Sequence, residues 1–385
     1  MTATKLFAPE TLQPASLQEI LGLPGPCLTL FLPPYRPGEL ASTPAALLKA
    51  GLQHAGQELA ERRCPETDRA ELFAPLEELA QDPELLEGSG RGRAIFRSPE
   101  LLRQFHMIQP VPASVVVAGS FAVRPLLAEL QLPRVFYILA LSKDHVQLMR
   151  CEDFRAKAVG LPPGFPLSLE EAMAFEPPDH DLENRSAAGS STGAMRRVRF
   201  GTGSGRETQH AHLSDFYKLV DRGIHQILPK GDVPLVLAGV AEETDAYRAI
   251  SGYRNLSAGT LQGSPDFASQ EPEFLMQAYS LLRAEATVRE LEALTEAIER
   301  AAPSHVSTDP DEVLRAAFEG RVRQLYIDES ANRTGVFERG RYRTCGREDL
   351  LNLAAVQTIL HRGGAFGLPH GMMPPGLSAA AILRF

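Results

Sequence analysis

A glycine- and arginine-rich segment in the middle of the chain has the residue types of a phosphate-binding site. Residues 184–212 read NRSAAGSSTGAMRRVRFGTGSGRETQHAH, and 12 of these 29 residues are Gly, Ser or Thr. The net charge of the segment is +4, whereas the rest of the chain carries −13. Its positive charge comes from Arg185, Arg196, Arg197, Arg199 and Arg206. Because a guanidinium group can bond two phosphate oxygens at once, the segment predicts a contact with phosphate groups, such as those of RNA. The alternative is a solvated loop whose arginines pair with the acidic body of the protein.

The same segment also contains groups that suit ester hydrolysis. Gly201, Gly203 and Gly205 leave room for an ester to approach the backbone, and Gln209 is a candidate for holding the attacking water. An alternative is that the glycines surround a nucleotide phosphate, but the GxxxxGK[ST] pattern is absent and they follow the basic run RRVRF. No cofactor is therefore expected.

Other polar residues give weaker signals. His210 and His212 lie on one face if the segment is a strand, but no third ligand stands at a recognisable spacing, so no metal site is predicted. Glu242 and Glu243 follow the apolar run PLVLAGVA, at the end of a strand where active sites of α/β proteins cluster. Acidic residues at the start of a helix are the simpler interpretation, because they interact favourably with the helix dipole.

Composition limits the class of protein. The chain has 385 residues, a net charge of −9 and 44% hydrophobic residues, which is typical of two or three globular domains. The acidic balance argues against a general DNA-binding protein, so no DNA partner is expected. Four cysteines without a CxxC pair, and the lack of a signal-peptide pattern, favour the cytoplasm. No apolar run is long enough to span a membrane, and the oligomeric state is not indicated.

The elements that must position these residues form an α/β pattern with three expected domains. Residues 1–128 are predicted to be the N-terminal α/β domain, 129–262 the middle domain and 263–385 the C-terminal domain. In the first, apolar runs and helical spacing predict strands at 27–32, 93–98 and 113–119, and helices at 43–62, 67–81 and 121–130.

In the middle domain, two strands at 135–142 and 145–152 are joined by a turn at Lys143-Asp144. A mobile loop is expected over 177–212, followed by an amphipathic helix at 213–228 and a central strand at 234–241. The C-terminal domain is predicted to begin with a helical region at 273–302, as two helices or one long one. Its further elements are a helix opened by Asp309-Pro310 and closed by Gly320, a strand at 322–329, a helix at 349–361 and a final strand at 381–385.

These patterns resemble a known family. The stretches VFYILALSKDHVQLMRCEDF (135–154), DEVLRAAFEGRVRQLYIDES (311–330) and LAAVQTILHRGGAFGLPHGMMPPGLSAAAILRF (353–385) resemble the middle and third domains of archaeal and eukaryotic class I release factors, and more closely those of their bacterial relatives. The resemblance covers roughly 130–385 and, more weakly, the N-terminal unit. It implies three domains: the middle one ribonuclease-H-like, and the C-terminal one a layered α/β/α domain like the ribosomal proteins that bind kinked RNA.

The resemblance also implies a role in translation, with one departure. Release factors hydrolyse peptidyl-tRNA through a Gly-Gly-Gln tripeptide before the long helix of the middle domain. This chain has GTGSGRETQH (201–210) at that place and no Gly-Gly-Gln anywhere. The expected function is therefore binding of the ribosome or tRNA-like RNA, in quality control or in resting ribosomes, without reading of stop codons. Two alternatives are a peptidyl-tRNA esterase that uses residues 201–209 and a protein–protein scaffold with no RNA role.

Overall fold

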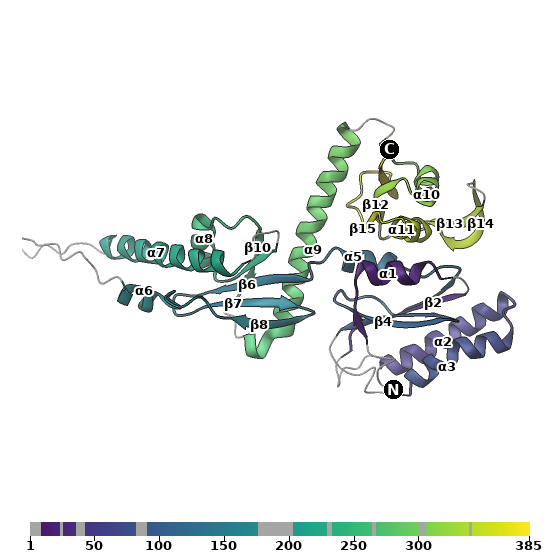
Figure 1. Cartoon of the computed structure of the whole chain (residues 1–385), viewed down its shortest axis with the longest axis horizontal. Helices are drawn as coiled ribbons and strands as arrows, with labels where there is room; N and C mark the ends of the chain where they lie inside the picture. Colours follow the sequence, from purple (N-terminus) through teal and green to yellow (C-terminus); the bar gives the residue numbers. More distant parts are fainter. Residues whose placement is uncertain are drawn as a thin grey trace, which may run out of the picture. The chain divides into compact units, whose positions relative to one another are not determined.

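The computed structural model describes most of the chain as a mixed α/β protein (Figure 1). It describes residues 9–23, 26–35, 43–81, 91–175, 203–228, 233–263, 267–300, 305–338 and 341–385. The chain divides into two compact units: residues 133–281 form one, and residues 1–132 and 282–385 together form the other. Each of the three domains expected from the sequence contains one main sheet, while their exact boundaries remain a prediction.

The N-terminal part of the first unit is a five-stranded sheet with helices on both faces. The strands are β1 (Glu10–Thr11), β2 (Cys27–Leu32), β3 (Gly92–Ser98), β4 (Leu101–Met107) and β5 (Ser114–Ala118), in the order β1-β4-β3-β2-β5. The helices are α1 (Pro14–Leu21), α2 (Pro44–Glu61), α3 (Glu66–Leu79), the 3₁₀ helix η2 (Arg124–Leu126) and α5 (Leu127–Leu130). Leu48, Leu52 and Leu59 of α2 recur at helical spacing and pack on the sheet, as predicted.

The C-terminal part of the same unit is a layered α/β/α arrangement, as the resemblance implied. The sheet order is β11-β16-β12-β15, and a separate hairpin joins β13 to β14. The strands are β11 (Val306–Ser307), β12 (Val322–Asp328), β13 (Thr334–Glu338), β14 (Arg341–Asp349), β15 (Gly364–Leu368) and β16 (Ala379–Leu383). Helices α10 (Pro310–Phe318) and α11 (Leu350–Leu360) cover one face, and the end of α9 (Phe267–Arg300) packs through Leu294 on the other.

One hydrophobic core joins the N-terminal and C-terminal parts of this unit. It contains Leu17 of α1 and Phe96 of β3 together with Leu351 of α11 and Leu325 of β12. Each of these side chains is 3% exposed or less. Because burial of a large apolar side chain contributes about 1.5–3 kcal/mol, this shared core holds segments that are more than 200 residues apart in sequence.

The second unit is a five-stranded sheet whose pairing agrees with the ribonuclease-H-like expectation. Strands β6 (Val135–Leu141), β7 (Val146–Glu152) and β8 (Arg155–Val159) are antiparallel neighbours, and β9 (Leu235–Gly239) and β10 (Leu256–Gln262) add in parallel beyond β6. The predicted turn is confirmed, since the Ser142 N–H donates to the His145 carbonyl at 3.0 Å. The helices are α6 (Leu169–Phe175), α7 (Gly203–Ile227), α8 (Ala241–Ile250) and the beginning of α9.

Two predicted elements need correction. The region 273–302 is a single helix that begins earlier, at Phe267, and ends at Arg300. The helix predicted at 121–130 begins only at Arg124, and its first turn is 3₁₀. Residues 121–123 remain non-helical because Asn352 bonds the backbone of Phe121 and Val123, so these groups are not available to a helix.

Candidate functional site

The predicted RNA-binding residues divide between undescribed residues and helix α7. Arg185, Arg196, Arg197, Arg199 and Gly201 lie outside the described residues. Gly203, Gly205, Arg206 and Gln209 lie within the first turns of α7, which runs from Gly203 to Ile227. The prediction of an irregular loop as far as residue 212 is therefore wrong for residues 203–212.

The physical reason for this correction is the low cost of extending a helix that already exists. The apolar face from Leu213 onward fixes α7 on the sheet, and each further residue then gains a backbone hydrogen bond without a new nucleation step. Residues 206–212 contain neither Gly nor Pro, so nothing in them stops the helix.

The helix changes what the segment can do chemically. His210 and His212 belong to a helix and not to a strand, which removes the strand-based argument for a pair. Gly203 and Gly205 are in the first turn, where backbone N–H groups lack partners within the helix. This placement favours binding of an anion at the start of the helix. It is less suited to the esterase alternative, which requires an open loop.

Buried side chains fix the lower half of α7 on the sheet of the second unit. Phe216, Val220 and Ile224 are almost fully buried among residues of β6, β7 and β9, such as Leu139 and Leu237. Any ligand bound at the N-terminal end of α7 would therefore act on a helix whose position is set by the core of the unit.

Asp221 is the main polar anchor of α7. Its carboxylate accepts hydrogen bonds from Tyr247 Oη at 2.9 Å, Ser251 Oγ at 2.8 Å and the Gly252 N–H at 3.3 Å. The ring of His225 lies 3.4 Å from the same carboxylate. The arrangement is not a hydrolytic triad, because the serine donates to the aspartate and the histidine is not between them. We interpret it as a structural link between α7 and the end of α8.

Of the predicted acidic pair at the start of α8, Glu243 makes contacts that stabilise the fold. Glu243 is 7% exposed, and its Oε1 accepts a hydrogen bond at 3.2 Å from the Lys143 N–H in the β6–β7 turn. Burial raises the pKa of this carboxyl, while the hydrogen bond from Lys143 opposes the shift. Burial also raises the pKa of the nearby Tyr217, whose hydroxyl has no hydrogen-bond partner in the described part of the chain. The β6–β7 turn therefore occupies the edge of the sheet beside Glu243.

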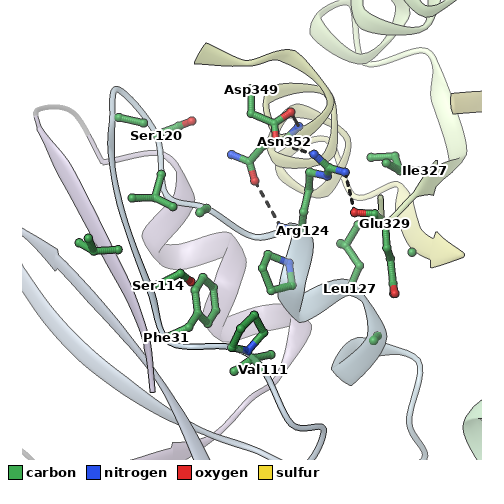
Figure 2. Close-up of a pocket in the computed structure, with 18 of the residues that line it drawn as sticks. Phe31, Val111, Ser114, Ser120, Arg124, Leu127, Ile327, Glu329, Asp349 and Asn352 are labelled. Carbon is green, nitrogen blue, oxygen red and sulfur yellow. Dashed lines mark hydrogen bonds and ion pairs between the residues drawn. The ribbon is translucent and has the colours of Figure 1, made fainter. Parts of the chain in front are cut away.

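The first unit contains a cavity that sequence reasoning did not anticipate. Its volume is about 570 Å³, within the usual range of ligand sites. Figure 2 shows that its lining combines residues of the N-terminal part with residues of the C-terminal part. The labelled residues are Phe31, Val111, Ser114, Ser120, Arg124 and Leu127 from the former, and Ile327, Glu329, Asp349 and Asn352 from the latter.

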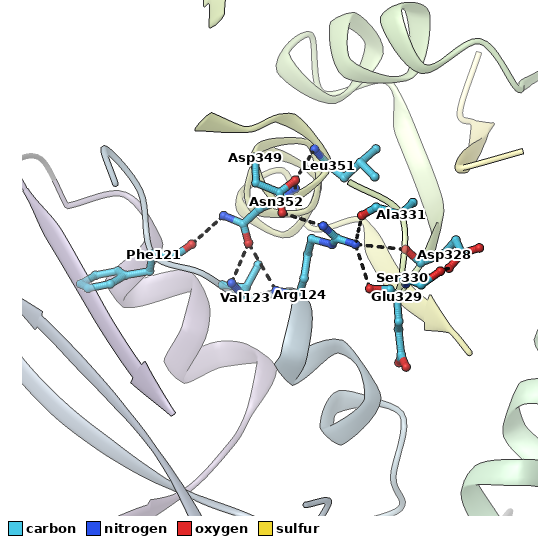
Figure 3. Close-up of polar contacts among 10 residues, drawn as sticks. All are labelled: Phe121, Val123, Arg124, Asp328, Glu329, Ser330, Ala331, Asp349, Leu351 and Asn352. Atoms are coloured by element: carbon cyan, nitrogen blue, oxygen red, sulfur yellow. Dashed lines mark hydrogen bonds and ion pairs between the residues drawn. The ribbon is translucent and has the colours of Figure 1, made fainter. Parts of the chain in front are cut away.

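Arg124 forms the densest set of contacts at this cavity (Figure 3). Its Nη1 bonds Asp349 at 2.6 Å. Its Nη2 donates to the carbonyls of Asp328 at 3.1 Å, Glu329 at 3.1 Å and Ala331 at 2.6 Å. The guanidinium therefore holds the loop after β12 against the start of α11. Asp349 itself caps α11, because its Oδ1 accepts from the Leu351 and Asn352 N–H groups.

Asn352 joins the same two parts through its buried amide (Figure 3). Its Oδ1 accepts from the Val123 N–H at 2.7 Å and the Arg124 N–H at 3.3 Å, and its Nδ2 donates to the Phe121 carbonyl at 2.9 Å. These bonds satisfy the backbone groups of Phe121 and Val123, which lie outside regular structure, and the N–H of Arg124 at the start of η2. A buried backbone group without a partner is costly.

Glu129 is a buried carboxyl near the same cavity. It accepts a hydrogen bond from the Gln109 N–H, and Arg283 adds a favourable charge. Burial has the larger effect and raises the pKa of Glu129 to about 7. Arg283 in turn bonds Glu329 at 2.8 Å and Gln109 Oε1 at 3.4 Å, so these residues form a network across the two parts.

The described residues contain no group of three or more His, Cys, Asp or Glu side chains that could hold a metal ion. Among the described helices, none is both long and apolar enough to cross a membrane.

The second unit combines a five-stranded sheet with the long helix α7. Residues 135–321 match the family model of bacterial archaeo-eukaryotic release factor family 3. This match agrees with the resemblance to the bacterial relatives of the archaeal and eukaryotic release factors that the sequence indicated. No curated protein matches the chain.

Several solved structures are similar to the chain at low identity. The archaeal translation termination factor aRF1 is 14% identical, with 96% of each chain covered and a TM-score of 0.25. Pelota from Archaeoglobus fulgidus is 11% identical, with 77% of this chain and 80% of Pelota covered and a TM-score of 0.37. A structure of ribosome-bound archaeal Pelota and ABCE1 is 10% identical, with 98% and 95% covered and a TM-score of 0.32.

Sequence reasoning missed the contacts of Arg124, Asn352 and Glu129. Arg124 and Asn352 are 228 residues apart, and neither belongs to a motif. The local sequence offers one signal, which is Asp349 before an apolar helix. It predicts that Asp349 caps the helix, but it does not predict that the other carboxylate oxygen pairs with Arg124.

Proposed function

We propose that the chain is a release-factor-like protein that binds the ribosome or tRNA-like RNA through the glycine- and arginine-rich segment at the N-terminal end of α7. The observation that carries this proposal is the family match over residues 135–321, which spans the whole segment. The +4 charge of residues 184–212, against −13 for the rest, supplies the electrostatic attraction.

The sequence contains no Gly-Gly-Gln, the tripeptide that release factors use to hydrolyse peptidyl-tRNA. Without this tripeptide, the proposal is that the protein occupies stalled or resting ribosomes and does not terminate translation at stop codons. The anchored lower half of α7 supports this function, because it holds the charged end of the helix at a defined distance from the sheet. Pelota is one matched protein whose structure includes the ribosome, and the proposal extends that partner to this chain.

Co-sedimentation with ribosomes through a sucrose gradient, at about 50 and about 200 mM salt, tests the proposal. If binding depends on three phosphate contacts, this rise in salt should weaken it roughly 20- to 40-fold. The test variant carries Arg196→Ala, Arg197→Ala and Arg199→Ala together. The matched control removes three exposed arginines elsewhere, Arg289, Arg300 and Arg323.

The expected result is that the wild type and the control travel with ribosomes at low salt, whereas the test variant does so weakly and with a smaller salt dependence. Equal binding of test variant and control would show that the segment does not contact RNA. A wild type that stays at the top of the gradient at both salt concentrations would contradict the proposal and favour the protein scaffold.

A further inference from the structure

Strand β5 forms one edge of the N-terminal sheet, and the cavity of the first unit follows it. β5 pairs with β2 on one side, and no strand of the described chain pairs with its other side. All five residues of β5, Ser114 to Ala118, line the cavity. The free side of an edge strand presents backbone N–H and C=O groups that can pair with another strand.

The composition of β5 leaves this edge unprotected. Proteins usually protect an edge with charged residues, proline or a bulge. β5 reads Ser-Val-Val-Val-Ala, and its pairing with β2 runs through five consecutive positions without a shift in register. Val116 is 37% exposed, and Figure 2 places Ser114 beside Phe31 with Val111 below them on the cavity wall. An extended segment along β5 would therefore meet both free backbone groups and an apolar surface.

The charges around the cavity are paired, with one exception. The ion pairs are Arg62–Glu58, Arg124–Asp349 and Arg283–Glu329. Glu348 also lines the cavity and is exposed, and it has no ion-pair or hydrogen-bond partner in the described part of the chain. It lies at the end of β5, because a Cβ added to Gly119 would be 3.1 Å from Glu348 Oε1. A segment that follows β5 past Ala118 reaches this carboxylate.

Within the part of the chain that the structure describes, Gln109 leaves one amide donor unpaired beside the cavity. Gln109 is 8% exposed and lines the cavity, and its Nε2 has no hydrogen-bond partner among the described residues. Its Oε1 accepts from Arg283, which fixes the orientation of the amide. A buried donor without a partner is costly, so the described residues around the cavity leave one hydrogen bond unmade.

We propose that the groove along β5 binds an extended peptide segment of a partner protein, which pairs with β5 as an additional strand and places a Lys or Arg beside Glu348. Binding of this kind takes affinity from main-chain hydrogen bonds and specificity from alternate side chains. A different protein fits better than a second copy of this chain, because the sequence from Ser114 to Ser120 contains no basic residue to meet Glu348.

Selection from a library of random seven-residue peptides tests the proposal with the full chain. The selection uses the wild type, with counter-selection against Val116→Lys, which places a charge in the groove. The matched control is Val288→Lys on α9, since Val288 is exposed by 52% outside the cavity. The selected peptides are expected to alternate β-branched residues and to contain Lys or Arg. Their affinity, measured by fluorescence anisotropy, should fall at least tenfold for Val116→Lys and stay unchanged for Val288→Lys.

Two further measurements separate strand pairing from other binding. N-methylation of alternate amides of a selected peptide should abolish binding, because it removes main-chain donors. Glu348→Arg should reverse the preference, so that a peptide with Glu in place of Lys binds better. The proposal is overturned if no selected peptide distinguishes Val116→Lys from Val288→Lys, or if N-methylated peptides bind equally well. A concentration-dependent dimer of the wild type that Val116→Lys dissociates would assign the groove to a second copy and overturn it as well.

Discussion

The amide of Asn352 is expected to be a large single contribution to the stability of the first unit. Replacement by alanine removes three hydrogen bonds, to the Val123 N–H, the Arg124 N–H and the Phe121 carbonyl. A buried hydrogen bond contributes about 1 kcal/mol, and a buried group left without a partner costs about 1–3 kcal/mol. Because Asn352 is only 6% exposed, water cannot replace these bonds easily. Asn352→Ala should therefore lower the free energy of unfolding of this unit by about 3–5 kcal/mol.

Hydrogen exchange followed by mass spectrometry is a suitable assay, because the chain contains no Trp to report unfolding by fluorescence. Amides of residues 121–130 and of α11 should exchange faster in the variant, while those of the second unit should not change. Asn352→Leu fills the space without hydrogen bonding and should be nearly as destabilising. Asn332→Ala, at an exposed asparagine, is the control and should change stability by less than about 0.5 kcal/mol. If Asn352→Leu restores wild-type exchange, packing and not hydrogen bonding is responsible, and the reasoning is refuted.

Three further predictions concern other buried groups. The pKa of Glu129 is 4.5 for the free group and about 7 in the folded protein, so the unfolded state ionises first as pH rises. The free energy of unfolding should therefore fall by about 3 kcal/mol between these two pKa values. Glu129→Gln should flatten this pH dependence in urea unfolding curves. Gly239→Ala would place a Cβ 2.6 Å from the Leu141 carbonyl oxygen between β9 and β6, so it should destabilise the second unit by on the order of 3 kcal/mol in thermal unfolding, and an unchanged melting temperature would contradict this. Tyr247→Phe removes one donor from Asp221 and should cost about 1–3 kcal/mol, seen as faster exchange of α7 amides; exchange like that of the wild type would mean that the remaining donors suffice.

The sequence predicted elements well where one physical pattern dominates. The strands at 27–32 and 135–141 are continuous apolar runs, and α10 has both its N-cap at Asp309 and its closing glycine at Gly320 where they were expected. Strand β4 was missed because LLRQFHM mixes polar residues into its buried positions. The hairpin of β13 and β14 was missed because its residues are mostly polar and do not alternate. In these strands the partner strand, and not the local pattern, determines the structure.

The candidate sites show the same limit. The charge of the glycine- and arginine-rich segment is visible in the sequence, but the helical state of Gly203 to His212 depends on how residues from Leu213 onward pack on the sheet. The cavity of the first unit is formed by β5 and by residues more than 200 positions later. No spacing rule connects positions so far apart, so a single sequence cannot indicate which side chains meet there.

The shared core of the first unit has a consequence for how the chain folds as it is synthesised. Leu17 and Phe96 leave the ribosome long before Leu325 and Leu351, with the whole second unit made in between. At about 5–20 residues per second, this interval lasts on the order of ten seconds or more. During this time the apolar face of the N-terminal sheet lacks its later neighbours, while the second unit already has all of its own. We therefore expect the second unit to reach its native state first, and the N-terminal sheet to be the region that most needs protection by chaperones.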